Sequence, residues 1–157
     1  MIGPPQNPAL DSRVIARLLA MPGRKIVCGG TTGNIVARQL NQPIRVPLET
    51  GAPGIPPIGR LDGVDLLTEG VLTLAGVVEN LRRDISLTDV KKKSDGVSRL
   101  YRELLRADEI RILLGQAINP AHQDPRTPVH SGLKFHMVKE LRSRLGEKGK
   151  SVTVEKF

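Results

Sequence analysis

The sequence predicts an α/β fold, in which helices form the two outer layers of a three-layer sandwich around a mostly parallel sheet. Short apolar runs alternate along the chain with amphipathic stretches of about 10–13 residues, a pattern typical of βαβ units. Because crossovers between parallel strands are right-handed, their helices cover both faces of the sheet, and the expected architecture is Rossmann-like. The 157 residues fit a single domain spanning residues 1–157.

Each expected helix carries apolar residues three or four positions apart, so that they gather on one face. The first helix, for example, places Leu10, Val14 and Leu18 on one stripe. A threonine is available as N-cap where the second helix begins, and Asp95 can cap the fourth. In chain order, the expected helices are residues 9–21, 31–40, 71–82, 95–106 and 133–145.

Each expected strand is a short apolar run followed by glycine or by polar residues. Pro47 restricts the second of these runs to an edge of the sheet, because proline cannot donate a ladder hydrogen bond. The three prolines and three glycines of residues 50–60 indicate a loop, and the polar stretch 84–96 indicates a surface insertion. In chain order, the expected strands are residues 25–28, 44–48, 64–67, 110–114 and 151–157.

Positive charge gathers in the second half of the chain. Residues 1–80 hold 7 basic and 6 acidic side chains, residues 81–157 hold 17 and 10, and the net charge of the chain is +8. A basic half can bind nucleic acid or an acidic partner. Single-strand binding also needs aromatic stacking platforms, and the chain has one tyrosine, two phenylalanines and no tryptophan. We therefore expect no nucleic-acid partner and interpret most of the charge as solvated helix faces.

Composition favours a cytoplasmic protein. The single cysteine, Cys28, excludes a disulfide framework and a zinc site built from several cysteines. No apolar run approaches the length of about 18 residues that a membrane-spanning helix needs, so we expect no membrane partner. The first ten residues do not have the pattern of a secretory signal. The oligomeric state is left open by the sequence.

Four loops with glycine or small polar residues follow the expected strands. If the strands are parallel, all four loops lie at one edge of the sheet, where ligands of open parallel sheets bind. Tight strand-to-helix turns also need glycine for steric reasons alone, so the convergence of the loops predicts a ligand site more strongly than any single loop. The loops are residues 3–5, 29–34, 68–70 and 115–119.

The loop that follows residues 25–28 is the best candidate for binding an anion. Gly29 and Gly30 let the backbone approach a ligand closely, and free N–H groups at the start of the next helix favour a phosphate or carboxylate. Thr31 and Thr32 add hydroxyl donors. A Walker loop is excluded, since Asn34 stands where that motif needs lysine. Asn34 itself is kept among the candidate ligand-binding residues.

Glu69 and Gly70 follow another strand at the same expected edge. Glu69 can act as a general base, or bind a polar or cationic group of the ligand. It can equally cap the next helix, whose N-terminal dipole favours a carboxylate. The sequence leaves both alternatives open.

Asn119 and His122 lie in a proline-bounded loop, where they would line the far wall of the site. His122 can serve as a general base, or it can be an ordinary loop histidine. The spacing of the three histidines matches no metal motif, so we expect no metal, and the sequence identifies no cofactor. Cys28 ends a buried strand and is expected in the core.

Several of these segments together resemble one family. Residues 26–38, 61–74, 119–123 and 151–155 are similar to the region that follows the catalytic domain in sporulation stage II protein E-like phosphatases, the metal-dependent PPM-type serine phosphatases of bacteria. The similarity covers nearly the whole chain. It implies that residues 1–5 would form an interior strand and turn in a longer protein, so that the chain is expected to be an excised domain or the product of a separate gene.

The resemblance is to this appended C-terminal domain and not to the phosphatase core, whose metal-binding aspartates lie on a β-sandwich. The Asp-Gly pairs at Asp62 and Asp95 are isolated from each other. We therefore expect a ligand-binding or regulatory domain that serves a serine phosphatase domain in cis or in trans, with phosphatase activity residing in that separate domain. Two alternatives are open. One is a small enzyme that acts on a phosphorylated or nucleotide substrate with Glu69 or His122 as base, and the other is a protein-docking module that uses the basic half.

Overall fold

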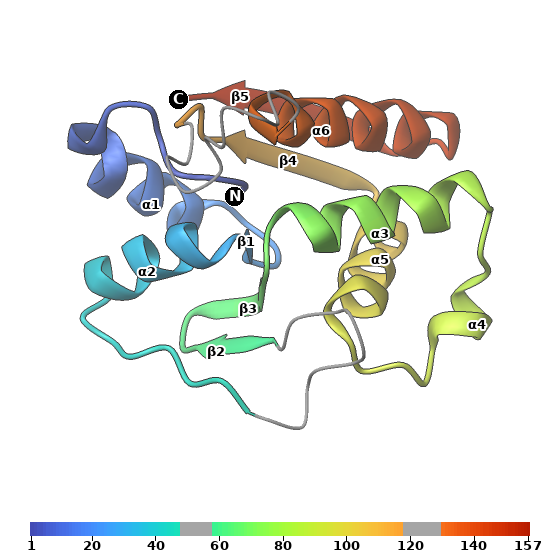
Figure 1. Cartoon of the computed structure of the whole chain (residues 1–157), viewed down its shortest axis with the longest axis horizontal. Coiled ribbons are helices and arrows are strands. Elements are labelled where there is room, and N and C mark those ends of the chain that lie inside the picture. The colour runs from blue at the N-terminus through green and yellow to red at the C-terminus, as the bar shows by residue number, and fades with distance from the viewer. Residues whose placement is uncertain (48–57, 118–129) are drawn as a thin grey trace.

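The chain folds into a mixed α/β structure, shown in Figure 1. The structure is a computed structural model and describes residues 1–47, 58–117 and 130–157. The helices are η1 (Pro8–Leu10, a 3₁₀ turn), α1 (Asp11–Ala20), α2 (Gly30–Gln39), α3 (Val71–Arg82), α4 (Leu87–Val90), α5 (Gly96–Arg106) and α6 (His130–Glu147). The strands are β1 (Ile26–Cys28), β2 (Gly59–Leu61), β3 (Val64–Thr68), β4 (Glu109–Leu114) and β5 (Ser151–Lys156).

All five expected helices are confirmed, and α3 has the bounds that the apolar spacing predicts. Asp95 caps α5, because its Oδ1 accepts a hydrogen bond from the Ser98 N–H at 2.9 Å. The expected threonine cap of α2 is wrong. Gly29 occupies the N-cap position and no side chain caps the helix, so both Thr31 and Thr32 lie inside its first turn.

The strands form two small sheets. β1 pairs in parallel with β3, and β4 pairs in parallel with β5, whereas β2 lies antiparallel to β3. The strand order is β1-β3-β2 in one sheet and β4-β5 in the other. β2 overlaps the end of residues 50–60, where the sequence predicts only a loop. The edge strand expected at 44–48 is wrong for its described part, since Arg45 makes a single antiparallel bridge to Arg60 and residues 44–47 form no strand.

The first three residues lie between the two sheets and link them. Ile2 forms single parallel bridges to Cys28 of β1 and to Leu114 of β4. The Ile2 N–H donates to the Leu113 carbonyl, and the Ile2 carbonyl accepts from the Gly115 N–H, each at 2.9 Å. Residues 1–3 are therefore an interior, strand-like segment in parallel with its neighbours on both sides.

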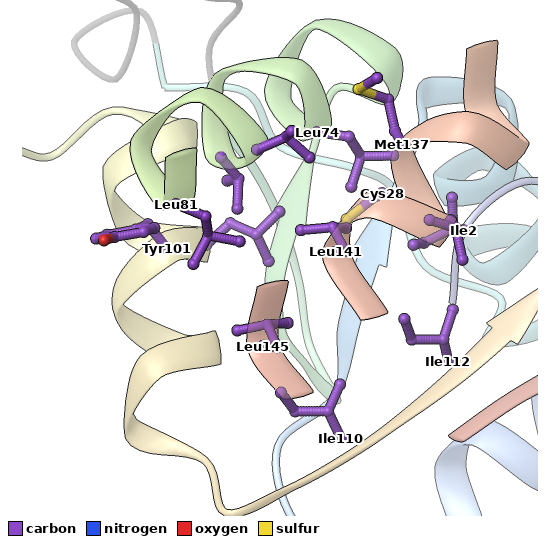
Figure 2. Close-up of a cluster of buried hydrophobic side chains, with 14 of the residues drawn as sticks. Ile2, Cys28, Leu74, Leu81, Tyr101, Ile110, Ile112, Met137, Leu141 and Leu145 are labelled. Carbon is purple, nitrogen blue, oxygen red and sulfur yellow. The ribbon is translucent and has the colours of Figure 1, made fainter. Parts of the chain in front are cut away.

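Two clusters of buried apolar side chains lie on opposite sides of the strands. Neighbouring strand residues alternate between them, as pleated backbone requires, so that Leu66 belongs to one cluster and Leu67 to the other. The larger cluster contains side chains of α3, α5 and α6 and is shown in Figure 2. The smaller cluster contains side chains of α1 and α2. The strands thus have two of these helices on one side and three on the other (Figure 1).

The segment 84–96 carries α4 and is held against the larger cluster. Val90 is buried within that cluster. The Tyr101 hydroxyl donates to the Ile85 carbonyl at 2.5 Å, and the Arg102 guanidinium donates to the Val90 carbonyl at 2.5 Å. This mostly exposed segment therefore contributes one fully buried side chain to the core, and the partly buried Ile85 packs against the same cluster.

Candidate functional site

The four glycine-containing loops meet at one edge of the strands, as far as they lie within the described residues. The Gly29 N–H donates to the Thr68 carbonyl at 2.9 Å, which joins the β1–α2 loop to the β3–α3 loop. The Gly3 N–H donates to the Cys28 carbonyl at 3.5 Å. In the loop after β4, the Ala117 N–H donates to the Pro4 carbonyl at 3.2 Å. The predicted convergence of these loops is confirmed.

At one position of this edge, residue 115, close contact with the backbone is enough to explain why the residue is glycine. A Cβ on Gly115 would stand 2.0 Å from the Pro4 carbonyl oxygen, so no side chain fits there. Gly70 is less confined, since its Cβ would stand 3.4 Å from the Gly29 Cα, an ordinary contact distance. Steric need therefore explains Gly115 without a ligand.

The start of α2 leaves backbone amides without a partner among the described residues. Gly29 adopts φ 118° and ψ 130°, a conformation that is essentially restricted to glycine. The first bond of the helix runs from the Gly33 N–H to the Gly29 carbonyl, at 2.8 Å. The N–H groups of Gly30, Thr31 and Thr32 precede this bond and have no side-chain cap. Their partial positive charge suits an anion.

A buried hydroxyl without a partner lies beside these amides. Thr32 is 1% exposed, and its Oγ1 has no hydrogen-bond partner in the part of the chain that the structure describes. The hydroxyl adjoins Gly29, where a Cβ would stand 3.0 Å from it. An unsatisfied buried hydroxyl costs about 1–3 kcal/mol, and a ligand at the start of α2 would supply the missing partner. The other polar candidates of this loop, Thr31 and Asn34, are exposed.

Glu69 caps α3 from the neighbouring loop. Its Oε2 accepts hydrogen bonds from the N–H groups of Leu72 at 3.0 Å and Thr73 at 3.4 Å. The side chain thus adopts the capping role that the sequence leaves open, while its Oε1 accepts no hydrogen bond from the described residues. Gly70 brings this loop against Gly29, so Glu69 lies close to the start of α2. The Thr73 Oγ1 is also buried and unpartnered within the described structure.

Lys134 also belongs to this edge, although it is not among the residues predicted from the sequence. From near the start of α6, its Nζ donates to the carbonyls of Gly115 at 2.5 Å and Ala117 at 2.9 Å. The same atom lies 2.8 Å from the place of a Cβ on Gly3. Partial burial lowers the pKa of Lys134. A lysine near a helix start opposes the helix dipole, and this mismatch is the signal in the sequence that points to a local role.

The Met1 amine and the Cys28 thiol are both buried next to Ile2. Met1 precedes Ile2 in the chain, and Cys28 is its bridge partner in β1. The amine donates to the Ile26 carbonyl at 2.7 Å. Burial lowers the pKa of this amine and raises the pKa of the Cys28 thiol. The thiol is therefore protonated at neutral pH, which suits a core cysteine and not a nucleophile.

Three candidate residues remain. Asn119 and His122 fall outside the described residues, and Asn34 lies one turn beyond the start of α2. Within residues 1–47, 58–117 and 130–157, no group of three His, Cys, Asp or Glu side chains is placed to hold a metal ion. Over the same residues, no helix has the length and apolar character needed to span a membrane.

Comparison with known proteins adds no relative. Neither a protein-family model, nor a curated protein, nor a solved structure matches the chain. Function is therefore inferred from the residues that the structure brings together, which are Gly29, Gly30, Thr31, Thr32, Glu69 and Gly70.

Proposed function

We propose that the chain is a ligand-binding or regulatory domain that binds a small anionic ligand, bearing a phosphate or carboxylate, at the start of α2. The supporting observation is that unpaired amides at this helix start lie beside the buried, unpartnered hydroxyl of Thr32. The amides are donors, and the hydroxyl can donate as well. A negatively charged acceptor would satisfy both at once.

The charges nearby favour a particular kind of ligand. The Lys134 ammonium lies against Gly3 and adds positive charge at this edge. The Gly3 N–H in turn donates to the carbonyl of Cys28, which directly precedes Gly29. Glu69 brings a negative charge from the other side, with one carboxylate oxygen left without a partner among the described residues. We infer a ligand with an acidic group for the amides and a hydroxyl or amino group for Glu69.

The resemblance in sequence supports the wider part of the proposal, in which this domain serves a bacterial serine phosphatase in cis or in trans in the cytoplasm. Catalysis then belongs to the separate phosphatase domain. We also infer a Rossmann-like three-layer sandwich, because Ile2 bridges the two sheets and helices pack on both sides. In such folds, ligands bind beyond the carboxyl ends of parallel strands, which is where α2 begins.

The enzyme alternative has less support. A general base needs a carboxylate free to take a proton from substrate, and one Glu69 oxygen already caps α3. The docking alternative rests on the basic half of the chain, whose exposed charges are partly neutralised by ion pairs such as Arg82–Glu140 at 3.1 Å.

Inorganic phosphate is the probe that tests the proposal. Titrated into the ¹⁵N-labelled chain, it should shift the amide resonances of Gly30, Thr31 and Thr32 and raise the melting temperature in proportion to the logarithm of its excess. Absence of both effects up to millimolar phosphate would refute an anion site at α2.

Two matched variants locate the site. Thr32→Val removes the unpartnered hydroxyl at the start of α2, and Thr73→Val removes the equivalent hydroxyl at the start of α3. Neither loses a hydrogen bond and each removes an unsatisfied buried hydroxyl, so both should fold and be at least as stable as the parent. Thr32→Val should weaken phosphate binding about tenfold, because a hydrogen bond to a charged group is lost, whereas Thr73→Val should bind as the parent does. Equal affinities in the two variants would exclude Thr32 from the site.

A further inference from the structure

The helices α2 and α3 start next to each other. A Cβ on Gly70, the N-cap of α3, would stand 3.4 Å from the Cα of Gly29, the N-cap of α2. The Gly29 N–H also donates to the Thr68 carbonyl, so Gly29 adjoins the residues on both sides of Glu69. From this contact the two helices run apart in Figure 1. A group bound at the start of α2 therefore lies beside the carboxylate that caps α3.

The start of α3 shows how a carboxylate binds to such a helix. The Glu69 Oε2 accepts from the N–H groups of Leu72 and Thr73, which are the second and third residues of α3. The second and third residues of α2 are Thr31 and Thr32, and no side chain caps this helix. A ligand carboxylate would accept from their N–H groups in the same way. The start of α2 thus lacks the group that Glu69 supplies to α3.

The charge of Glu69 acts on the same place. Besides burial, this charge raises the pKa of the Cys28 thiol, and Cys28 directly precedes Gly29. A phosphate monoester carries a charge of about −1.5 to −2 at neutral pH, whereas a carboxylate carries a single charge. Repulsion by Glu69 therefore disfavours a phosphate more than a carboxylate.

Glu69 also has the capacity to bind a cation. Its Oε1 accepts no hydrogen bond from the described residues. Within residues 1–47, 58–117 and 130–157, Glu69 forms no ion pair. A ligand hydroxyl could donate to this oxygen, but only an ammonium would also neutralise its charge beside the ligand carboxylate.

The closeness of the two helix starts favours a short ligand. The amides that follow Gly29 and the free oxygen of Glu69 belong to adjoining loops, so one small molecule can reach both. In an α-amino acid, the carboxylate and the ammonium are attached to the same carbon. Its zero net charge also matches one uncapped helix start and one unpaired carboxylate.

We propose that the ligand at the start of α2 is a free α-amino acid, an inference that rests on the proposed function. Its carboxylate accepts from the amides of Thr31 and Thr32, beside the buried and unpartnered hydroxyl of Thr32. Its ammonium pairs with the Glu69 Oε1. Glu69 thus serves both helix starts, because one oxygen caps α3 and the other holds the ligand.

Alanine and three of its analogues test this inference by titration into the ¹⁵N-labelled chain. Alanine should shift the amide resonances of Thr31 and Thr32. Propionate lacks the ammonium and should bind about tenfold more weakly, because the charge pairing with Glu69 is lost. Alaninamide lacks the carboxylate and should not shift these resonances. β-Alanine separates its two charges by one further carbon and should bind more weakly than alanine.

The outcomes separate this inference from the proposed function. Equal affinity of alanine and propionate would overturn the role of the ammonium and leave the anion site in place. Tighter binding of β-alanine than of alanine would replace the α-amino acid by a longer zwitterion. If phosphate shifts the resonances of Thr31 and Thr32 and millimolar alanine does not, the inference alone fails. If neither compound shifts them, the proposed function fails with it.

A pair of variants tests the contact with Glu69. Glu69→Gln keeps an oxygen that can cap α3 and removes the charge, so it should weaken alanine binding about tenfold without weakening propionate binding. Glu79→Gln makes the same change on the exposed face of α3 and should leave both affinities unchanged. An unchanged affinity of Glu69→Gln for alanine would overturn the contact. An equal loss for alanine and propionate would also overturn it, because Glu69 would then act only through the fold.

Discussion

Two junctions at one edge of the molecule have nearly the same plan but treat their amides differently. Each runs from a strand through glycine into a helix, and the last residues of the two strands, Cys28 and Thr68, are register partners. In the β3–α3 junction, Glu69 turns back and caps the helix. In the β1–α2 junction, no side chain does so, and the amides that follow Gly29 are left for another partner.

The comparison indicates that one residue determines whether the first backbone amides of a helix are bonded within the chain or remain available to a ligand. At β3–α3, a carboxylate precedes the glycine and satisfies the first turn from within the chain. At β1–α2, two glycines stand together, and neither has a side chain that can cap. The four predictions below test this contrast, from the largest expected effect to the smallest.

Gly29→Ala should destabilise the protein far more than Gly70→Ala. Gly29 has φ 118°, which strains any residue with a Cβ, and that Cβ would also meet the Thr32 Oγ1 at 3.0 Å. We expect a loss of about 1–3 kcal/mol in the free energy of unfolding, measured by urea denaturation. Gly70 has a negative φ of −85° and room for a methyl group. Equal losses would show that the two glycines are equivalent.

Glu69→Ala should lower the free energy of unfolding by about 0.5–2 kcal/mol, the usual cost of losing a helix cap. Thr31→Ala, at the corresponding helix start, should change it by no more than about 0.5 kcal/mol, because Thr31 is exposed and caps nothing. Urea denaturation of both variants measures the difference. A Thr31→Ala loss as large as that of Glu69→Ala would mean that α2 is capped after all.

Stability should depend on pH through the buried groups beside β1. Burial lowers the pKa of the Met1 amine from its ordinary value of 8.0, so below that pH the unfolded chain binds the extra proton and stability rises as the pH approaches 8. Burial raises the pKa of the Cys28 thiol from its ordinary value of 9.0, so stability falls as the pH rises above 9. Urea midpoints between pH 7 and 9.5 should therefore peak between pH 8 and 9.

The matched variant for this profile is Cys28→Ala. It removes the thiol and should flatten the fall above pH 9 while it keeps the rise toward pH 8. Thr73 does not titrate in this range and its buried hydroxyl has no partner among the described residues, so Thr73→Val should preserve both limbs. A falling limb that persists without the thiol would assign it to other groups.

Hydrogen exchange should distinguish the two helix starts without any mutation. The N–H groups of Leu72 and Thr73 are bonded to Glu69 and should exchange more slowly than those of Thr31 and Thr32. Added phosphate should slow exchange at Thr31 and Thr32 alone. Exchange at equal rates in the two junctions would remove the contrast.

Much of the fold follows from the apolar pattern. The helices are predictable because each buries one face, and α5 is predictable to its cap because Asp95 directly precedes it. β2 escapes prediction since it has only three residues, of which only Leu61 is buried, and its position depends on pairing with β3. Pro47 permits an edge strand at residues 44–48, but the described part of this segment pairs with β2 only through the single bridge between Arg45 and Arg60.

The site is predictable in place but not in detail. Parallel strands bring the loops of Gly29 and Glu69 together, which the strand pattern alone implies. Whether Glu69 caps its helix depends on a side-chain rotation that sequence does not determine. The threonine cap fails because the unusual φ of Gly29 starts the helix earlier. Lys134 reaches this edge from a distant helix, through contacts that have no local pattern.

The placement of the first residues also bears on how the molecule unfolds. Met1 belongs to the smaller cluster and Ile2 to the larger, so one short segment is shared by both halves of the core. Its partner Leu114 comes from far along the chain, and contacts of such long range form slowly. A protease that removed this tripeptide would therefore be expected to lower the melting temperature of the whole chain, because both clusters would lose a buried side chain and each contains residues of both sheets.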